Sequence, residues 1–512
     1  MPTLLKILAI MLCAVLIACG GGSSDNESDI PDENIPAEDS DAVEPGENDE
    51  DSDPLSDTDN AVEETDEVVI PDENTDEDSA ETPDEDTDYE ELQTGGIYIF
   101  SDFDESGNAQ SREILGNGGF FGFSILTLSD KYWAVSAIHE SIPAFDWDKA
   151  TGKLYIFEKE KKVEKLEDAA FVLNHPEKSL NVGFGYTAAE LCDINGDGFD
   201  DLAVSSHLAP FGDLYAAGEI VVFYGDASGW NEESTSISRL SSTYIQKADS
   251  MSQSLACLDY DGDGFADVFA GGQNAGPELS GGGSQGMVAM FKGSPQGLSE
   301  HENSVLLPEV EEKAQYFGSS MLADDLNGDS LPDLIVAGWG LKESGNSANS
   351  GGIYIYFGGE NWFAGASEKF FGLQDSQFGS MVKIVEIAGE KYIGMLAPKA
   401  GNSGAVYFDR AADFHQGGAL SVPENQGYGE GNLSDFDMIK ISETSDLFIA
   451  GGKTFGTGGM IFCAKAENGE FIEALKKCAF QPDSPEGGFG YSVKNIGNGE
   501  IVVGKPEYIH RF

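Results

Sequence analysis

Residues 183–206 read GFGYTAAELCDINGDGFDDLAVSS, which is an apolar segment, an acidic loop and a second apolar segment. The loop places Asp193, Asn195, Asp197 and Asp201 at positions 1, 3, 5 and 9. Like charges this close together repel, so the crowding needs a reason. Two interpretations fit: a solvated acidic turn, or a cage of oxygen ligands around a cation. The rest of the chain bears on this choice.

This stretch opens one of seven related units, because similar segments recur along the chain. The first segments of the units start at Phe120, Gly183, Ser250, Tyr316, Gln377, Gly427 and Gly488. The second segments start at Tyr132, Asp201, Asp267, Asp333, Tyr392, Leu447 and Ile501. The third segments start at Gly152, Gly218, Gly286, Gly351, Gly404 and Gly458. All are short runs of β-branched and aromatic residues bounded by glycine, which favours strands.

Three strands and a more variable fourth, repeated seven times, are typical of a β-propeller. The sequence therefore predicts an all-β, seven-bladed propeller over residues 93–512. A third-segment motif, GGIYIF at Gly95, also precedes the first unit, and the last unit is cut short by the end of the sequence. We expect N-terminal strands to complete the last blade and so remove exposed sheet edges. Either one or two of them can join it, depending on whether YIHRF (508–512) is itself a strand.

The combination of Phe-Gly, an acidic D-x-N/D-x-D-G-x-x-D-L loop and a G-x-V-Y-V-F-like strand resembles the FG-GAP repeat of integrin α-chain heads and of bacterial surface proteins. The similarity is strong in units two to four. The third unit has lost its Phe-Gly pair, and the sixth has Tyr in place of Phe. The resemblance implies a β-propeller like that of the integrin α-chain head.

Three units carry the long acidic loop between their first and second segments, whereas the other four have a tight turn there. Each loop offers side-chain oxygens at positions 1, 3, 5 and 9 and a backbone carbonyl at position 7, the oxygen ligands that calcium prefers. The predicted ligands are Asp193, Asn195, Asp197, Phe199 and Asp201; Asp259, Asp261, Asp263, Phe265 and Asp267; and Asp325, Asn327, Asp329, Leu331 and Asp333.

These loops are not EF-hands, because position 12 is Val204, Ala270 or Val336 instead of Glu, and strands flank them. Ser330 stands in the third loop where the other two have Gly198 and Gly264. We expect up to three structural calcium ions.

The N-terminus is predicted to be a targeting segment and not part of the fold. Lys6 and the apolar run ILAIMLCAVLIA (7–18) precede Cys19, and LIAC followed by Gly20 resembles a bacterial lipobox. The resemblance implies a signal peptide over residues 1–18 and a lipid on Cys19. It also implies a bacterial envelope location at the outer membrane, on either its periplasmic or its outer face.

Residues 19–92 are predicted to be a lipidated cysteine followed by a disordered acidic tether. Residues 24–92 contain 32 Asp and Glu and no Lys or Arg, and so low a hydrophobicity cannot drive compaction. A solvated spacer is favoured over a calcium buffer or an export signal. The rest of the chain has 60 acidic against 28 basic residues, which argues against nucleic acid as a partner.

Four cysteines remain after Cys13 and Cys19. Cys463 and Cys478 flank a predicted hairpin and can form a local disulfide in an oxidising compartment. Cys192 and Cys257 fit equally well as a bridge or as two buried thiols.

The sequence favours a binding module for a protein or a glycan, anchored to the membrane by its lipid, over an enzyme. Aromatic residues in the connections, including Phe145, Trp147, Phe211, Tyr215 and Trp339, are either contact residues or packing between blades. His139 and His207 are expected to line loops or pockets. No motif with the flanking elements of a known catalytic site was found. The alternative is a surface hydrolase acting on polysaccharide or phosphoester substrates.

Overall fold

In the computed structural model the chain separates into two units, Met1–Glu90 and Glu91–Phe512. The structure describes residues 95–138, 152–177, 183–214, 216–241, 250–277, 279, 285–310, 312–343, 350–400, 404–411, 420–421, 432–453, 459–472, 476–478, 480 and 488–506. The predicted signal peptide, Cys19 and the acidic tether lie outside them. Within the described residues no helix has the length and apolar character needed to cross a membrane.

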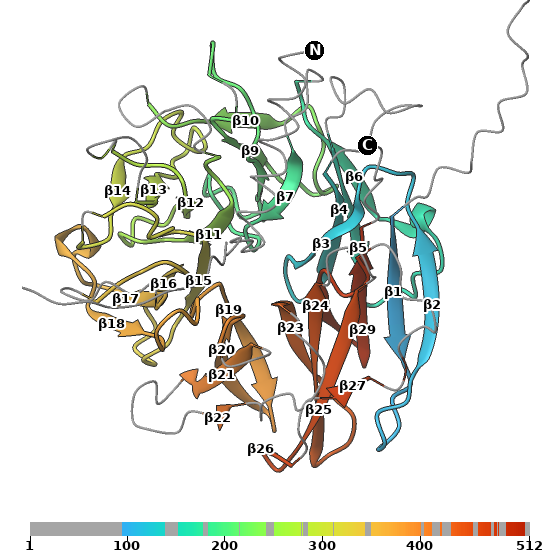
Figure 1. The fold of residues 1–512 in the computed structure, drawn as a ribbon. Coiled ribbons are helices and arrows are strands. Elements are labelled where there is room, and N and C mark those ends of the chain that lie inside the picture. The colour runs from blue at the N-terminus through green and yellow to red at the C-terminus, as the bar shows by residue number, and fades with distance from the viewer. Residues whose placement is uncertain are drawn as a thin grey trace, which may run out of the picture. The chain divides into compact units, whose positions relative to one another are not determined.

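Seven antiparallel sheets form the second unit, and each is one blade of a β-propeller (Figure 1). Blade 1 contains β3 (Phe121–Thr127), β4 (Tyr132–Ala137), β5 (Lys153–Glu158) and β6 (Phe171–Asn174). Blade 2 contains β7 (Phe184–Ala188), β8 (Leu202–Ser206), β9 (Glu219–Phe223) and β10 (Thr235–Ser238). Blade 3 contains β11 (Ser254–Leu258), β12 (Asp267–Gly272), β13 (Met287–Phe291) and β14 (Ser304–Leu306). Blade 4 contains β15 (Ser320–Asp324), β16 (Asp333–Gly338), β17 (Gly352–Tyr356) and β18 (Glu368–Phe371).

The last three blades follow the same antiparallel order. Blade 5 contains β19 (Met381–Ile387), β20 (Glu390–Ala397), β21 (Ala405–Arg410) and β22 (Leu420–Ser421). Blade 6 contains β23 (Asn432–Lys440), β24 (Ser445–Lys453), β25 (Met460–Glu467), β26 (Glu470–Phe471) and β27 (Lys476–Lys477). Blade 7 contains β28 (Val493–Gly497), β29 (Glu500–Lys505), β1 (Gly96–Ser101) and β2 (Gln110–Leu115). The predicted all-β, seven-bladed fold is therefore confirmed.

Blade 7 closes the ring by joining the two ends of the propeller sequence. Its strands lie in the order β2-β1-β29-β28, so two N-terminal strands complete the blade. Ile97 pairs with Gly504 and Phe100 with Ile501 across the junction. The innermost strands touch in the sequence β3, β7, β11, β15, β19, β23 and β28, and β28 touches β3 again. The sequence left open whether one or two N-terminal strands join the last blade, and the structure shows two.

Seven apolar cores hold the described propeller together, and each lies between two neighbouring blades. In blade 2, every residue of β8 and β9 is buried. The middle strands are covered on both faces because the sheets stack around the ring. Their runs of Val, Ile, Ala and Phe are therefore continuous and do not alternate with polar residues.

In six of the blades, the glycine before the third strand packs against the Phe of the next blade's Phe-Gly motif or against the residue that replaces it. Before β21, a Cβ at Gly404 would instead meet Pro398 of its own blade. Gly286, before β13, forms a parallel bridge with Phe317 of blade 4. A Cβ at Gly286 would lie 2.3 Å from the Phe317 nitrogen, so only glycine fits. In the third unit, which lacks Phe-Gly, Met251 takes the place of Phe and is fully buried. Its carbonyl lies against Gly218, so the contact survives the loss of the motif.

Candidate metal centres

The three acidic loops lie at the same end of three consecutive blades, because each joins an innermost strand to the second strand of its sheet. Gly198 and Gly264, at position 6, have φ angles of +86° and +90°. Ser330 holds the same place in the third loop with φ +69°. The third loop thus adopts the same bend, although a side chain makes this conformation less favourable there.

The position-1 carboxylate organises each loop from within. In the first loop Asp193 Oδ1 accepts hydrogen bonds from the backbone N–H groups of Gly196 (2.7 Å) and Asp197 (3.1 Å). Its Oδ2 accepts one from Gly198 (2.9 Å). Asp259 and Asp325 accept the equivalent three bonds. A carboxylate has about four lone-pair sites, so it keeps capacity for a cation after accepting these bonds.

The position-9 carboxylate is buried and ties the loop to the third strand. Asp201 Oδ2 accepts from the N–H of Ile194 and its Oδ1 from the N–H of Gly225, both at 2.9 Å. Asp267 and Asp333 make the same two kinds of bond, and all three side chains are 0 % exposed. Burial raises the pKa of Asp201 and of Asp267 to about 6 and also raises the pKa of Asp333, against the lowering effect of these hydrogen bonds.

The glycine whose backbone N–H donates to the position-9 carboxylate is a residue of the site that was not predicted from the sequence. Gly225, Gly293 and Gly358 each stand two residues after the last aromatic residue of the third strand. The other four blades have no glycine at that place, so glycine and acidic loop occur together. The loop backbone passes too close for a side chain: a Cβ at Gly225 would lie 2.2 Å from the carbonyl oxygen of Asp200. This pairing within the repeat was the signal that could have revealed them.

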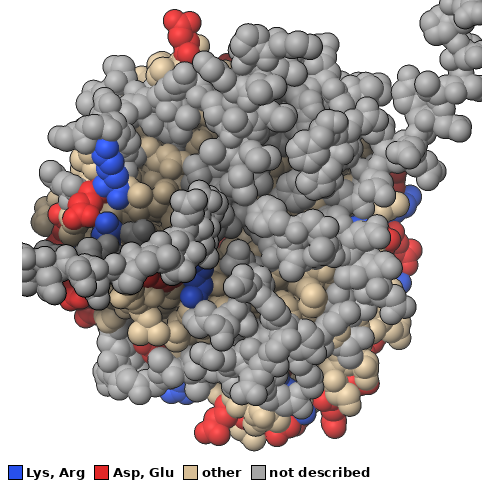
Figure 2. Space-filling model, in the orientation of Figure 1, with Lys and Arg blue, Asp and Glu red and all other residues tan. Residues whose placement is uncertain are grey.

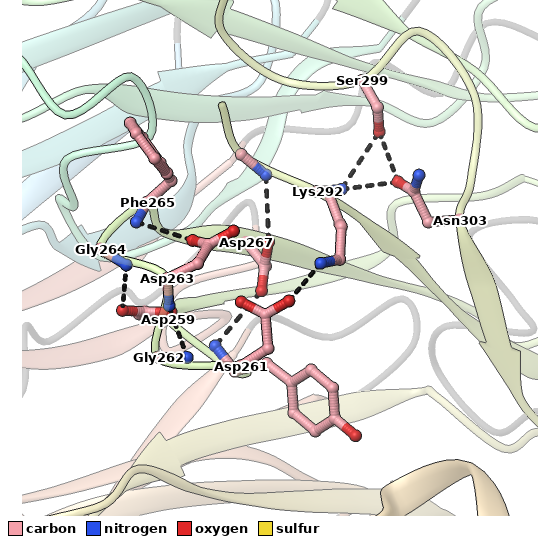
Figure 3. A network of polar contacts seen from close by, with 12 residues as sticks. Asp259, Asp261, Gly262, Asp263, Gly264, Phe265, Asp267, Lys292, Ser299 and Asn303 are labelled. Atoms are coloured by element: carbon pink, nitrogen blue, oxygen red, sulfur yellow. Dashed lines mark hydrogen bonds and ion pairs between the residues drawn. The ribbon is translucent and has the colours of Figure 1, made fainter. Parts of the chain in front are cut away.

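The second loop brings its predicted acidic ligands closest together. One carboxylate oxygen each from Asp259, Asp261 and Asp267 lie within 4.8 Å of one another. That spacing suits oxygens around one calcium ion, which stand about 2.3–2.6 Å from the metal. Figure 3 shows Lys292 of the neighbouring connection reaching Asp261, with which it forms an ion pair. Hydrogen bonding to Asp261 raises the pKa of Lys292, so a cationic side chain already contacts this predicted ligand.

The first and third loops have asparagine at position 3. Asn195 donates from Nδ2 to Asp197 Oδ2 and accepts from the Asp197 N–H, each at 2.9 Å. Asn327 makes the same contacts with Asp329. In the part of the chain that the structure describes, these two loops form no three-carboxylate group like that of the second loop. Their donor set, three carboxylates with an amide oxygen and a carbonyl, still suits calcium.

The position-7 residues differ in their surroundings. Phe199 and Leu331 are 42 % and 44 % exposed. Phe265 instead packs on the first loop, where a Cβ added at Gly196 would lie 2.5 Å from its ring. The predicted ligand Asp263 accepts a hydrogen bond from the Phe265 N–H at 3.0 Å.

The first and second loops are joined covalently as well as by packing. Cys192, next to Asp193, forms a disulfide with Cys257 of β11, two residues before Asp259. The Ala266 N–H donates to the Asp193 carbonyl at 2.9 Å. Of the two alternatives for these cysteines, the structure has the bridge. It thereby connects the ends of two acidic loops in neighbouring blades.

The remaining predicted residues that the structure describes lie apart from these loops. Cys463 and Cys478 form a disulfide within blade 6. His207 is 3 % exposed and its ring lies 4.1 Å from that of Tyr186. Trp339 stacks on Tyr316 at 3.5 Å and donates to Gln273, whereas Phe211 is 37 % exposed. His139, Phe145, Trp147 and Tyr215 lie outside the described residues.

Comparison with known proteins identifies the repeat. The sequence model of the FG-GAP repeat family matches residues 184–223 and 317–356, which are the first three strands of blades 2 and 4 with their acidic loops. The chain carries FG-GAP repeats. Blade 3, between the two matched FG-GAP repeats, keeps the acidic loop but has lost the Phe-Gly pair itself.

Proteins similar to this chain include integrin α-chains. Integrin alpha-5 of Xenopus laevis is 31 % identical over 166 residues, which cover 31 % of this chain and 15 % of that protein. Integrin alpha-PS5 of Drosophila melanogaster is 31 % identical over 199 residues, covering 38 % and 18 %. Phosphatidylinositol-glycan-specific phospholipase D of Bos taurus is 27 % identical over 225 residues, covering 40 % and 26 %. The chain thus matches about a quarter or less of the length of each relative.

Proposed function

We propose that this chain is a lipid-anchored cell-envelope protein whose calcium-stabilised propeller is a binding or adhesion module for a protein or a glycan. The observation that carries the proposal is the set of three acidic loops, in register at one end of three consecutive blades, on an integrin-like FG-GAP scaffold. Propellers offer broad faces of connecting loops, although the fold alone does not determine function.

Calcium has a structural role in this proposal. In each loop the side chains at positions 1, 3, 5 and 9 and the carbonyl at position 7 would hold the ion. Its charge would offset the repulsion between the carboxylates and would favour the ionised form of the buried position-9 aspartate. Because that aspartate also bonds the glycine after the third strand, the ion would stabilise three strands of the blade together.

The anchor is proposed from the sequence alone. A lipid on Cys19 followed by the acidic tether would hold the propeller away from an outer membrane. A Cys19→Ala variant expressed in a Gram-negative host should move from the membrane fraction to the soluble fraction. Retention of this variant in the membrane would contradict the lipid anchor.

The binding function is tested by applying the full chain to glycan and protein arrays with calcium and again with a chelator. Selective binding that chelation weakens is expected. A blank array in calcium, with the protein shown to be folded by circular dichroism, would contradict the proposal. Figure 2 shows basic and acidic side chains interspersed along the rim of the face drawn, so arrays should include both charged and neutral ligands.

The similarity to a phosphatidylinositol-glycan-specific phospholipase D keeps a hydrolase as the second candidate. A panel of phosphoester and polysaccharide substrates distinguishes the two functions. Turnover that a His207→Ala variant abolishes, with unchanged thermal stability, would favour the hydrolase. Absence of turnover combined with array binding would favour the binding module.

A further inference from the structure

A polar pocket lies where the two ends of the propeller sequence meet, away from the acidic loops. Its volume is about 540 Å³. The turns β1–β2, β5–β6, β23–β24 and β28–β29 come together here, so blades 1, 6 and 7 all contribute. Each of these turns joins either the first and second or the third and fourth strand of a blade. The pocket therefore opens on the same end of the propeller as the acidic loops.

Arg112 is held rigidly in the pocket wall with donors to spare. Its Nε donates to the Val163 carbonyl at 2.7 Å, and Nη2 pairs with Glu500 Oε1 at 2.7 Å. A guanidinium has five N–H donors, so three have no partner among the described residues. The side chain is 20 % exposed. A fixed, partly buried guanidinium with free donors is suited to bind a carboxylate in two-pronged fashion.

The pocket is richer in basic residues than the protein around it. Arg112, Lys162 and Lys440 line it, against the two acids Asp102 and Glu500. Outside the tether, by contrast, acidic residues outnumber basic ones 60 to 28. Glu500 pairs with Arg112, and Lys162 pairs with Glu164 at 2.8 Å. Lys440 forms no ion pair with another described residue, so it adds a cation that a ligand can use.

The remaining lining combines an aromatic ring with neutral hydrogen-bonding groups. Phe103 lines the pocket, and its ring is fixed against Phe480 at 5.4 Å. The neutral polar residues that line it are Ser101, Gln110, Ser111 and Asn498. Cations, amides, hydroxyls and one apolar ring face match a ligand that has a carboxylate, several hydroxyls and an apolar ring face of its own. The volume is in the range of small-ligand sites.

We propose that this pocket binds a uronic-acid residue of an acidic saccharide. Arg112 and Lys440 bind the carboxylate, the amides and hydroxyls bind the sugar hydroxyls, and Phe103 packs on the sugar ring. The inference rests on the proposed binding function and specifies one of its ligands. It assigns the acidic loops of blades 2 to 4 to stability, and the short turns of blades 1, 6 and 7 at the same end of the propeller to recognition.

The test is calorimetric titration of the full chain with digalacturonic acid, at fixed free calcium. The comparison ligands are a neutral galactose disaccharide and inorganic phosphate. Binding of the uronate is expected, with the neutral sugar bound at least about tenfold more weakly, because a charge-assisted hydrogen bond is lost. Equal binding of the neutral sugar, preference for phosphate, or no uronate binding would overturn the proposal.

Variants locate the site. Lys440→Glu should weaken uronate binding by about tenfold or more, and Arg112→Gln should weaken it similarly. Lys399→Glu makes the same charge change at an exposed residue outside the pocket and should leave binding unchanged. Because Arg112→Gln also removes structural contacts, Lys440→Glu is the deciding variant. Binding that Lys440→Glu and Lys399→Glu reduce equally would overturn the site.

Failure of the pocket proposal and failure of the proposed binding function give different results. Array binding that survives Lys440→Glu contradicts the pocket but leaves the binding module intact. A blank array contradicts the binding module, whereas calorimetric binding of digalacturonic acid that Lys440→Glu weakens supports the pocket by itself.

Discussion

Blades 2 and 7 make the same connection, from innermost to second strand, in two different ways. In blade 7, Asn498 and Gly499 have φ angles of +54° and +72°, the left-handed pair of a tight hairpin turn. That turn is specified by two residues. In blade 2, the nine residues from Asp193 to Asp201 form this connection. Their conformation depends on a hydrogen bond from Gly225, which follows the third strand, to Asp201. The backbone bend of the short turn is local, and Asn498 Nδ2 adds one contact to the Lys159 carbonyl of blade 1. The acidic loop, by contrast, depends throughout on groups that only the folded blade brings together.

Calcium removal should separate the two kinds of blade and have the largest effect. At a free calcium concentration about 100 times the dissociation constant, each site adds about 2.7 kcal/mol to the free energy of unfolding. Three sites would therefore add about 8 kcal/mol. Thermal unfolding of the full chain should therefore occur at a markedly lower temperature in chelator. Hydrogen exchange should accelerate in the loops of blades 2 to 4 and not in the β28–β29 turn. An unchanged midpoint would contradict calcium binding.

Breaking the Cys192–Cys257 disulfide should have the next largest effect. Its cysteines are 65 residues apart, so the chain-entropy estimate for the bridge is about 4 kcal/mol. A Cys192→Ser, Cys257→Ser variant should be less stable and should also bind calcium more weakly in blades 2 and 3, because the two loop ends are no longer held together. The matched control is Cys463→Ser, Cys478→Ser, which should lower stability without changing calcium affinity in a titration. Equal calcium affinity in both double variants would show that the bridge does not position the loops.

Removing the position-9 carboxylate tests the link between loop and third strand. Asp201→Ala leaves the N–H groups of Ile194 and Gly225 without their acceptor, at a cost of about 2–4 kcal/mol. The loss should persist in chelator, because these bonds do not need the ion. Asp130→Ala removes an exposed acid from the tight turn of blade 1 and should change the free energy of unfolding by less than about 0.5 kcal/mol. A loss seen only with calcium present would assign Asp201 to the metal alone.

Replacing Lys292 should have the smallest effect on stability. Together with a matched replacement beside the third loop, it tests whether a lysine competes with calcium in the second loop. Lys292→Met removes an exposed ion pair worth about 0.2–1 kcal/mol. It also frees Asp261, so calcium affinity of the second loop should rise several-fold, as measured by titration. Lys391→Met breaks the pair with Asp324, which is not a predicted ligand, and should leave calcium affinity unchanged. An unchanged or lower affinity in Lys292→Met would show that the lysine does not compete with the ion.

The strand pattern was predictable because it is local. Runs such as EIVVF in β9 and the glycines around them repeat in every unit, and their spacing sets seven blades of similar length. Which units carry a long acidic loop and which a tight turn is equally visible, since each connection consists of a few consecutive residues. The loss of Phe-Gly in unit three was visible too, but its replacement by Met251 was not, because burial of that side chain depends on the neighbouring blade.

By itself, the sequence determined the seven units, the strand elements and the acidic residues in three of the connections. Only the tertiary structure decided that two N-terminal strands close the ring, that Cys192 bonds to Cys257, and that Asp201 is buried against Gly225. It also decided that Arg112, Lys440 and Asn498 line one pocket. The physical reason is the same in each case. Propensity and periodicity act over a few residues, whereas these contacts join groups tens to hundreds of residues apart, and they exist only once the blades have packed into a closed ring.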